Sequence, residues 1–113
     1  MKTYPIKDET GRLFALEVDM VSSSLSNLVQ LIATAEGVTD AKARRLFANE
    51  GDVRARFRFH GVEFVVVEPF GNSSRYWIGP VSESTKLDIS LIERQLGLHV
   101  PTLLRRVLGA LLS

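Results

Sequence analysis

Two neighbouring stretches, Val53–His60 and Val62–Glu68, limit the possible fold more than any other part of the chain. In the first stretch, apolar residues alternate with arginines and a histidine, which is the period-two pattern of a strand with one buried face. The pair His60-Gly61 suits a two-residue turn, because glycine adopts a positive φ without steric cost. These residues therefore predict an antiparallel hairpin in which Phe59 faces Val62.

Strands are also predicted on either side of this hairpin. Lys2–Ile6 and Leu13–Asp19 are β-capable runs around the turn-rich sequence DETG, so an N-terminal hairpin is expected. Arg75–Gly79 follows a second turn sequence, FGNSS, and ends before a proline. It adds a third strand to the central hairpin and completes an antiparallel meander.

Helices are predicted before and after these strands. The serines at positions 22 to 24 are good N-cap residues for a helix over Leu25–Ala35, and Gly37 is a plausible stop. Near the C-terminus, Leu87–Leu96 has helical spacing and is followed by a glycine. Pro101 suits the first turn of a second helix that runs to about residue 111.

The segment from Gly37 to Asp52 has no single interpretation. Thr39 is a suitable cap for a short helix rich in alanine and arginine that ends near Gly51, and helix propensity favours this alternative. In the other interpretation, Ala41–Phe47 is a strand that turns at ANEG into the next one. We favour the helix, and the sequence leaves the strand open for residues 40–49.

The order of these elements predicts one α+β domain over residues 1–113. The antiparallel sheet would consist of the N-terminal hairpin and the three-stranded meander, with helices on one face and a helical pair at the C-terminus. A chain of 113 residues is too short for two domains that each bury a useful core.

Composition excludes several classes of function. The chain has no cysteine, which rules out disulfides, thiolate metal sites and cysteine nucleophiles. The charged opening sequence and the lack of a long apolar run argue against a signal peptide and a membrane span, so we expect a cytoplasmic protein. The net charge of +1 hides a local excess, because residues 40–58 carry six bases and three acids.

The chain lacks the motifs of an enzyme. His60 and His99 belong to no HxxH or HExxH pattern, and GxxxxGK[ST], GxGxxG and GxSxG are all absent. No carboxylate is set apart from the others by a pattern that indicates acid–base catalysis. We therefore expect no catalytic residues, no cofactor and no metal site.

The alternation places Arg54, Arg56, Arg58 and His60 on one face of their strand. Such a row of guanidiniums suits phosphates or another anion. The alternative is a solvated face, in which Arg58 pairs with Glu63 across the hairpin and the other two arginine stems cover valines. We favour the solvated face.

Trp77 is the second candidate for a binding surface. It lies on the opposite face of its predicted strand from Tyr76. On the arginine face, Trp77 would stack on a base or a guanidinium, or act as the anchor of a protein interface. The most common outcome is that such a tryptophan packs under a helix.

The segment ISLIERQLGLHVPTLLRRVL, residues 89–108, resembles the helix-turn-helix pattern of DNA-binding proteins. The resemblance covers about 20 residues and implies DNA contacts through His99, Thr102, Arg105 and Arg106. Glu93 stands where the helix crossing usually has alanine or glycine, and the second helix has apolar residues on its groove-facing side. We favour an amphipathic helical pair that covers the sheet or forms a dimer contact.

The last predicted helix has more apolar surface than one sheet face would bury. Its apolar residues span more than half of the circumference, and the candidates for a dimer or partner contact are Leu104, Val107, Leu108 and Leu111. Together with the missing catalytic motifs, this surplus predicts a dimeric, non-catalytic module that binds protein as an adaptor, regulator or inhibitor. The alternative is nucleic-acid binding through the arginine face or the C-terminal helices.

Overall fold

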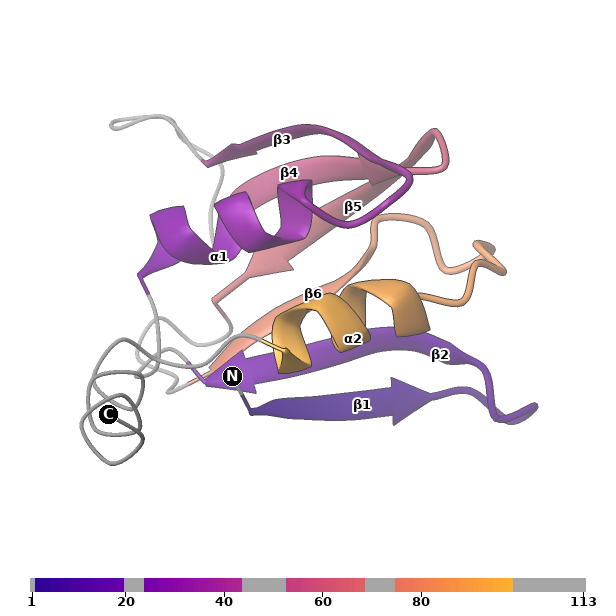
Figure 1. The fold of residues 1–113 in the computed structure, drawn as a ribbon. Coiled ribbons are helices and arrows are strands. Elements are labelled where there is room, and N and C mark those ends of the chain that lie inside the picture. Colours follow the sequence, from indigo (N-terminus) through magenta and orange to yellow (C-terminus); the bar gives the residue numbers. More distant parts are fainter. Residues whose placement is uncertain (1, 20–23, 44–52, 69–74, 99–113) are drawn as a thin grey trace.

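The computed structural model describes residues 2–19, 24–43, 53–68 and 75–98, and its six strands form one antiparallel sheet in the order β1-β2-β6-β5-β4-β3 (Figure 1). The strands are β1 (Thr3–Lys7), β2 (Leu13–Asp19), β3 (Val38–Ala43), β4 (Val53–Phe59), β5 (Val62–Val67) and β6 (Arg75–Pro80). Two described helices, α1 (Leu25–Ala33) and α2 (Ser90–Gly97), complete an α+β architecture. The predicted class is therefore confirmed at this level.

Near its turn the central hairpin follows the predicted register, whereas farther along Val53, and not Arg54 as expected, lies opposite Val67. His60 and Gly61 have φ values of 50° and 78°, which form the tight turn between β4 and β5. As predicted, Phe59 pairs with Val62 across this turn. Strand β6 then pairs antiparallel with β5 and also with β2, so the N-terminal hairpin and the meander share one sheet.

Helix α1 begins and ends close to its predicted limits. Ser24 is the N-cap, and its hydroxyl accepts a 3.1 Å hydrogen bond from the Asn27 amide. The helix buries Leu28 and Ile32. Gly37, with φ of 91°, lies three residues beyond the C-cap residue and leads into β3.

The favoured helical interpretation of the next segment is wrong for residues 38–43, which form the edge strand β3. Val38 pairs with Phe59 and Thr39 with Arg58, so the backbone of β4 supplies partners that outweigh the helix propensity of the segment. Asp40 has a φ of 53° at an irregularity in this pairing, a conformation that a helix cannot contain. Residues 44–52 lie outside the described part of the chain.

Helix α2 confirms part of the predicted C-terminal pair. It spans Ser90–Gly97 and starts three residues later than the sequence pattern predicted. Asp88 precedes the helix, and its carboxylate accepts hydrogen bonds from the amides of Ser90 (2.8 Å) and Leu13 (3.3 Å). The predicted second helix of the pair, from residue 101, lies outside the described residues.

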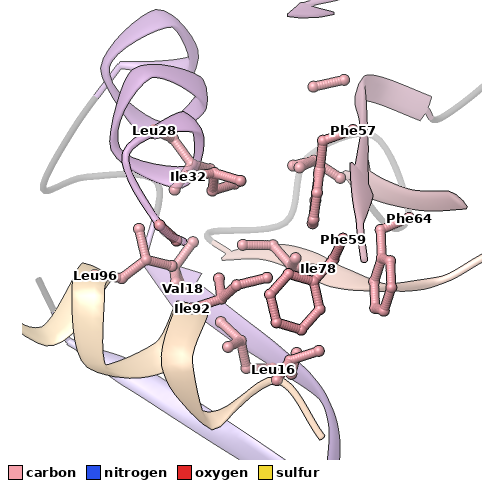
Figure 2. Packing of buried hydrophobic residues seen from close by; sticks show 14 of the residues in the cluster. Leu16, Val18, Leu28, Ile32, Phe57, Phe59, Phe64, Ile78, Ile92 and Leu96 are labelled. Carbon is pink, nitrogen blue, oxygen red and sulfur yellow. The ribbon is translucent and has the colours of Figure 1, made fainter. Parts of the chain in front are cut away.

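The core lies between the sheet and the two helices. Side chains from the sheet and from both helices form one buried cluster, which includes Leu16, Phe57, Phe59, Phe64, Ile78, Leu28, Ile32, Ile92 and Leu96 (Figure 2). All of these are at most 2% exposed. Phe57 and Phe64 stack with their ring centres 5.4 Å apart. The helix-covered face therefore takes the large apolar residues, and the opposite face, called the open face below, carries the others.

Candidate functional site

The open face is defined by the pairing register. A row of directly paired residues crosses five of the six strands and has Trp77 at its centre. The row reads Tyr4, Glu17, Trp77, Val67 and Val53 from β1 to β4. Neighbouring positions on β6 alternate between faces, so Tyr76 and the fully buried Ile78 belong to the helix-covered face.

Trp77 lies on the backbone of its own strand. A Cβ atom added to Gly79 would be 2.6 Å from Cζ2 of Trp77 and 3.0 Å from the Ala15 methyl group. The indole therefore rests over Gly79, where any other residue would push it away. It also helps to shield Ala15, which is fully buried although it faces away from the helices. Trp77 itself remains half-buried.

A pocket of about 790 Å³ lies beside this indole on the open face. The lining combines a mostly apolar floor with a few charged side chains, and comprises Asp8, Arg12, Phe14, Val53, Arg56, Val65, Trp77, Pro80, Val81, Glu83 and Thr85. This set is called the Trp77 pocket below. Its size and its mixed lining are typical of sites that hold a small ligand or an anchoring side chain.

Phe14 reaches the pocket because of a β-bulge. Ile6 pairs with Ala15 and Lys7 with Leu13, so Phe14 is an extra residue on β2 with no partner on β1. In a strand of regular alternation, Phe14 would lie on the same face as Leu16. The bulge instead turns Phe14 into the pocket and Leu13 into the core.

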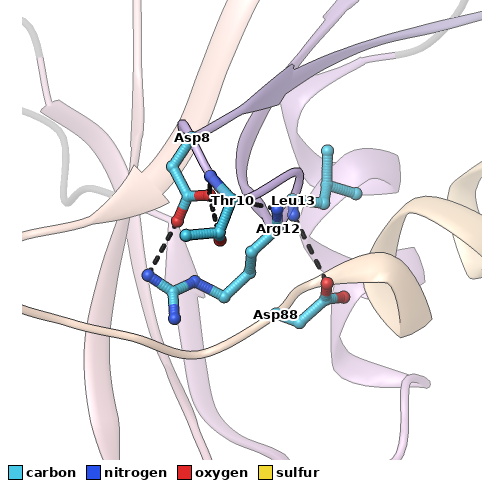
Figure 3. A network of polar contacts seen from close by, with 5 residues as sticks. All are labelled: Asp8, Thr10, Arg12, Leu13 and Asp88. Carbon is cyan, nitrogen blue, oxygen red and sulfur yellow. Dashed lines mark hydrogen bonds and ion pairs between the residues drawn. The ribbon is translucent and has the colours of Figure 1, made fainter.

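The turn between β1 and β2 holds the charged end of the pocket (Figure 3). The Asp8 carboxylate accepts hydrogen bonds from the Thr10 hydroxyl (2.6 Å) and the Thr10 amide (2.9 Å). Its second oxygen lies 2.7 Å from Nη2 of Arg12. These contacts, of which the Thr10 hydroxyl makes the largest contribution, lower the pKa of Asp8 and keep the carboxylate charged.

Arg12 is the least satisfied cation of the pocket. Its Nε is buried and has no acceptor among the residues that the structure describes. Asp8 is its ion-pair partner, and the side chain as a whole is 30% exposed. A guanidinium has five N–H donors, so this arrangement leaves donor capacity at the edge of an apolar pocket.

The predicted row of three arginines is not a free cationic surface. Arg56 pairs with Glu63 at 3.3 Å, and Arg58 lies 3.9 Å from Asp40. Arg58 lies opposite Glu63 in the strand pairing, as predicted. The predicted ion pair between Arg58 and Glu63 is wrong, because the Arg58 side chain lies toward Asp40 on β3.

A second bulge places Arg54 outside the row of arginines formed by alternate residues of β4. Val53 pairs with Val67 and Ala55 with Val66, so Arg54 is the extra residue on β4. It forms a 2.7 Å ion pair with Glu68. Both groups act on Tyr76, whose pKa is raised first by burial and then by Glu68, with Arg54 opposing the shift. Of the predicted surface residues, the structure thus brings Arg56 and Trp77 together in the pocket and places Arg54 and Arg58 elsewhere.

A second charged group on the open face was not predicted from the sequence. The Arg75 guanidinium carbon lies 3.4 Å from the ring centre of Tyr4, and Arg75 also pairs with Glu17 at 3.5 Å. The Tyr4 hydroxyl donates a 3.3 Å hydrogen bond to Asp19. These residues come from three strands, so a pattern within one strand cannot reveal the group.

Two kinds of site have no support in the described residues. The described part of the chain contains no group of three or more histidine, aspartate or glutamate side chains able to hold a metal ion. None of its helices has the length and apolar content needed to cross a bilayer. The dimer candidates Leu104, Val107, Leu108 and Leu111, and the helix-turn-helix contacts from His99 to Arg106, lie outside residues 2–98 and are not described.

Comparisons of the chain with models of protein families, with curated proteins and with solved structures found no match.

Proposed function

We propose that the protein is a non-catalytic interaction module that binds a protein partner through the Trp77 pocket. The observation that carries the proposal is the half-buried indole of Trp77 beside an apolar floor, on the sheet face opposite α1 and α2. Tryptophan and arginine next to an apolar depression are the residues that contribute most to the affinity of protein interfaces.

The exposed residues around the pocket support the same conclusion. Val81 lines the pocket and is 52% exposed, although an exposed valine at this position adds nothing to the core. A partner that covered Val81 and Trp77 would remove apolar surface from water, which is the main driving force of association.

The alternative proposal, nucleic-acid binding, has less support on the open face. The three arginines of β4 and Arg75 all lie within 4.0 Å of a carboxylate. A polyanion would compete with these acids for each guanidinium and would meet Asp8 and Glu83 at the pocket. A protein partner with both signs of charge meets no such conflict.

The test compares two variants that each remove one exposed or half-buried apolar side chain. Trp77→Ser changes the pocket, whereas Leu91→Ser changes α2, where Leu91 is 37% exposed. After chemical crosslinking, we expect the wild type and Leu91→Ser to retain a bound partner protein or a second copy of the chain. Trp77→Ser should retain neither. Equal retention by both variants would contradict the proposal.

A titration with nucleic acid separates the two functions. Fluorescence anisotropy of labelled single- and double-stranded DNA and RNA at low and near-physiological salt should show no binding that depends steeply on salt. Tight binding that weakens strongly as salt rises would instead support the nucleic-acid alternative, because it indicates counterion release from phosphates.

A further inference from the structure

We propose that the Trp77 pocket selects a partner segment in which an apolar side chain stands next to a single carboxylate, and that Arg12 binds this carboxylate. The inference rests on the proposed function and specifies the chemistry of the partner. Its evidence is the combination, in one pocket, of an aromatic floor and a guanidinium with unmet donor capacity.

The apolar part of the site is formed by residues from three strands and the segment after β6. Phe14 on β2, Val65 on β5 and Trp77 on β6 line the pocket together with Val81. Val65 is 7% exposed and the Trp77 ring rests over Gly79, so both walls are packed against the sheet before a ligand arrives. Fixed apolar walls favour binding because little side-chain freedom is lost.

The anionic part of the site follows from Arg12. Among the described residues, this guanidinium has one ion-pair partner, Asp8, and a buried Nε with no acceptor. The buried Nε is out of reach of a ligand, but a guanidinium has five N–H donors and the Arg12 side chain is 30% exposed, so other N–H groups remain that can meet a ligand oxygen. A carboxylate matches the planar guanidinium, because two oxygens accept two parallel hydrogen bonds.

The other charges of the pocket limit the ligand to one negative charge. Asp8 and Glu83 line the same pocket, and Glu83 is exposed. Both would repel a ligand with several phosphates, whereas a lone carboxylate needs to approach Arg12 alone. This charge pattern favours an acidic peptide side chain, or a C-terminal carboxylate, beside an apolar residue.

The test uses two small probes that share one aromatic ring system. 1-Naphthaleneacetate carries the carboxylate and 1-naphthaleneacetamide replaces it with a neutral amide. Each probe is titrated into the full ¹⁵N-labelled chain and followed by the indole N–H signal in a ¹H–¹⁵N correlation spectrum. Trp77 is the single tryptophan of the sequence, so this signal reports on the pocket without ambiguity.

We expect both probes to shift the indole signal and the acetate to bind about tenfold more tightly than the amide. Arg12→Gln should remove this preference while the amide still binds. Asp8→Asn should raise the affinity for the acetate and leave the amide unchanged, because it removes the competing charge but keeps an oxygen that accepts the Thr10 amide.

The possible outcomes distinguish this inference from the proposed function. Equal binding of the two probes to the wild type would overturn the role of Arg12 and leave an apolar anchor site intact. Failure of both probes to shift the indole signal would overturn the inference, while partner loss with Trp77→Ser would still test the interaction module separately. If Arg12→Gln still binds the acetate more tightly than the amide, another cation binds the carboxylate. This result would also overturn the inference.

Discussion

On the helix-covered face of the sheet, Phe57, Phe64 and Ile78 are at most 2% exposed, whereas on the open face Trp77 and Phe14 stay half-buried. The first face follows a regular alternation of apolar residues. The second contains Phe14, which a bulge has turned onto this face, together with ion pairs between neighbouring strands. Burial on one face supplies the stability that lets the other face keep groups that do not stabilise the fold.

The largest expected effect comes from a cavity in the helix-covered face. Phe64 is fully buried and contacts the rings of Phe57 and Phe59, so Phe64→Ala should lower the free energy of unfolding by about 3–5 kcal/mol. Urea denaturation followed by circular dichroism measures this change. Trp77→Ala removes a larger side chain from the open face and should cost less. A greater loss for Trp77→Ala would contradict the comparison of the two faces.

A smaller effect is expected where the open face is tightly packed. Gly79→Ala forces the Trp77 ring away from the sheet, which should cost about 1–3 kcal/mol and shift the tryptophan emission to longer wavelength. Gly97→Ala is the matched control, because a Cβ atom there meets nothing within 4 Å. It should leave the emission unchanged and slightly stabilise α2. Unchanged emission of Gly79→Ala would show that the indole does not rest on Gly79.

The N-cap of α1 tests how much the helices contribute beyond their buried side chains. Ser24→Ala removes the hydroxyl that accepts from the Asn27 amide and should cost about 1 kcal/mol in urea denaturation. Ser26→Ala, at an exposed position inside the same helix, should be neutral or slightly stabilising. Equal effects of the two changes would show that the cap does not support the helix-covered face.

The smallest effect concerns acid stability. The pKa of Asp88 is lowered, chiefly by hydrogen bonds from Ser90. The pKa of Asp8 is lowered, chiefly by the hydrogen bond from the Thr10 hydroxyl. A carboxyl group with a lower pKa in the folded state stabilises the fold above its ordinary value of 3.8, and this contribution is lost as the pH falls through the folded-state value.

The free energy of unfolding should therefore decrease as the pH falls from the ordinary pKa toward the lower folded-state pKa. Asp88→Asn should make this decrease less steep. Urea denaturation midpoints measured between pH 6 and the acid limit provide the test, with Glu36→Gln at an exposed position as the control. A midpoint that falls equally steeply in Asp88→Asn and wild type would contradict the role of Asp88.

The sequence predicted those parts of the fold that depend on neighbouring residues. The turn at His60-Gly61, the register of Phe59 with Val62 and the N-terminal hairpin follow from periodicity and glycine. Helix α1 follows from apolar spacing and a serine cap. Each of these signals lies within a short window of the chain, where local physical rules apply.

The features that the sequence did not predict depend on distant partners. Val38–Ala43 became a strand because β4 provides an edge, although the local propensity favours a helix. The bulges at Phe14 and Arg54 shift side chains between faces, and no residue type in the sequence marks them. The candidate site combined Arg56 and Trp77, which were considered from the sequence, with Arg12 and Phe14, which were not.

The two edges of the sheet have a further consequence for how molecules of this protein meet. Strand β1 contains Pro5, which has no N–H to offer, and β3 is interrupted at Asp40 by a residue with positive φ. Lys7 and Lys42 add exposed positive charge to these strands. Such edges resist the addition of another strand. Within residues 2–98 as described, the sheet thus ends at six strands, and concentrated protein is expected to resist fibril growth and to associate through its faces.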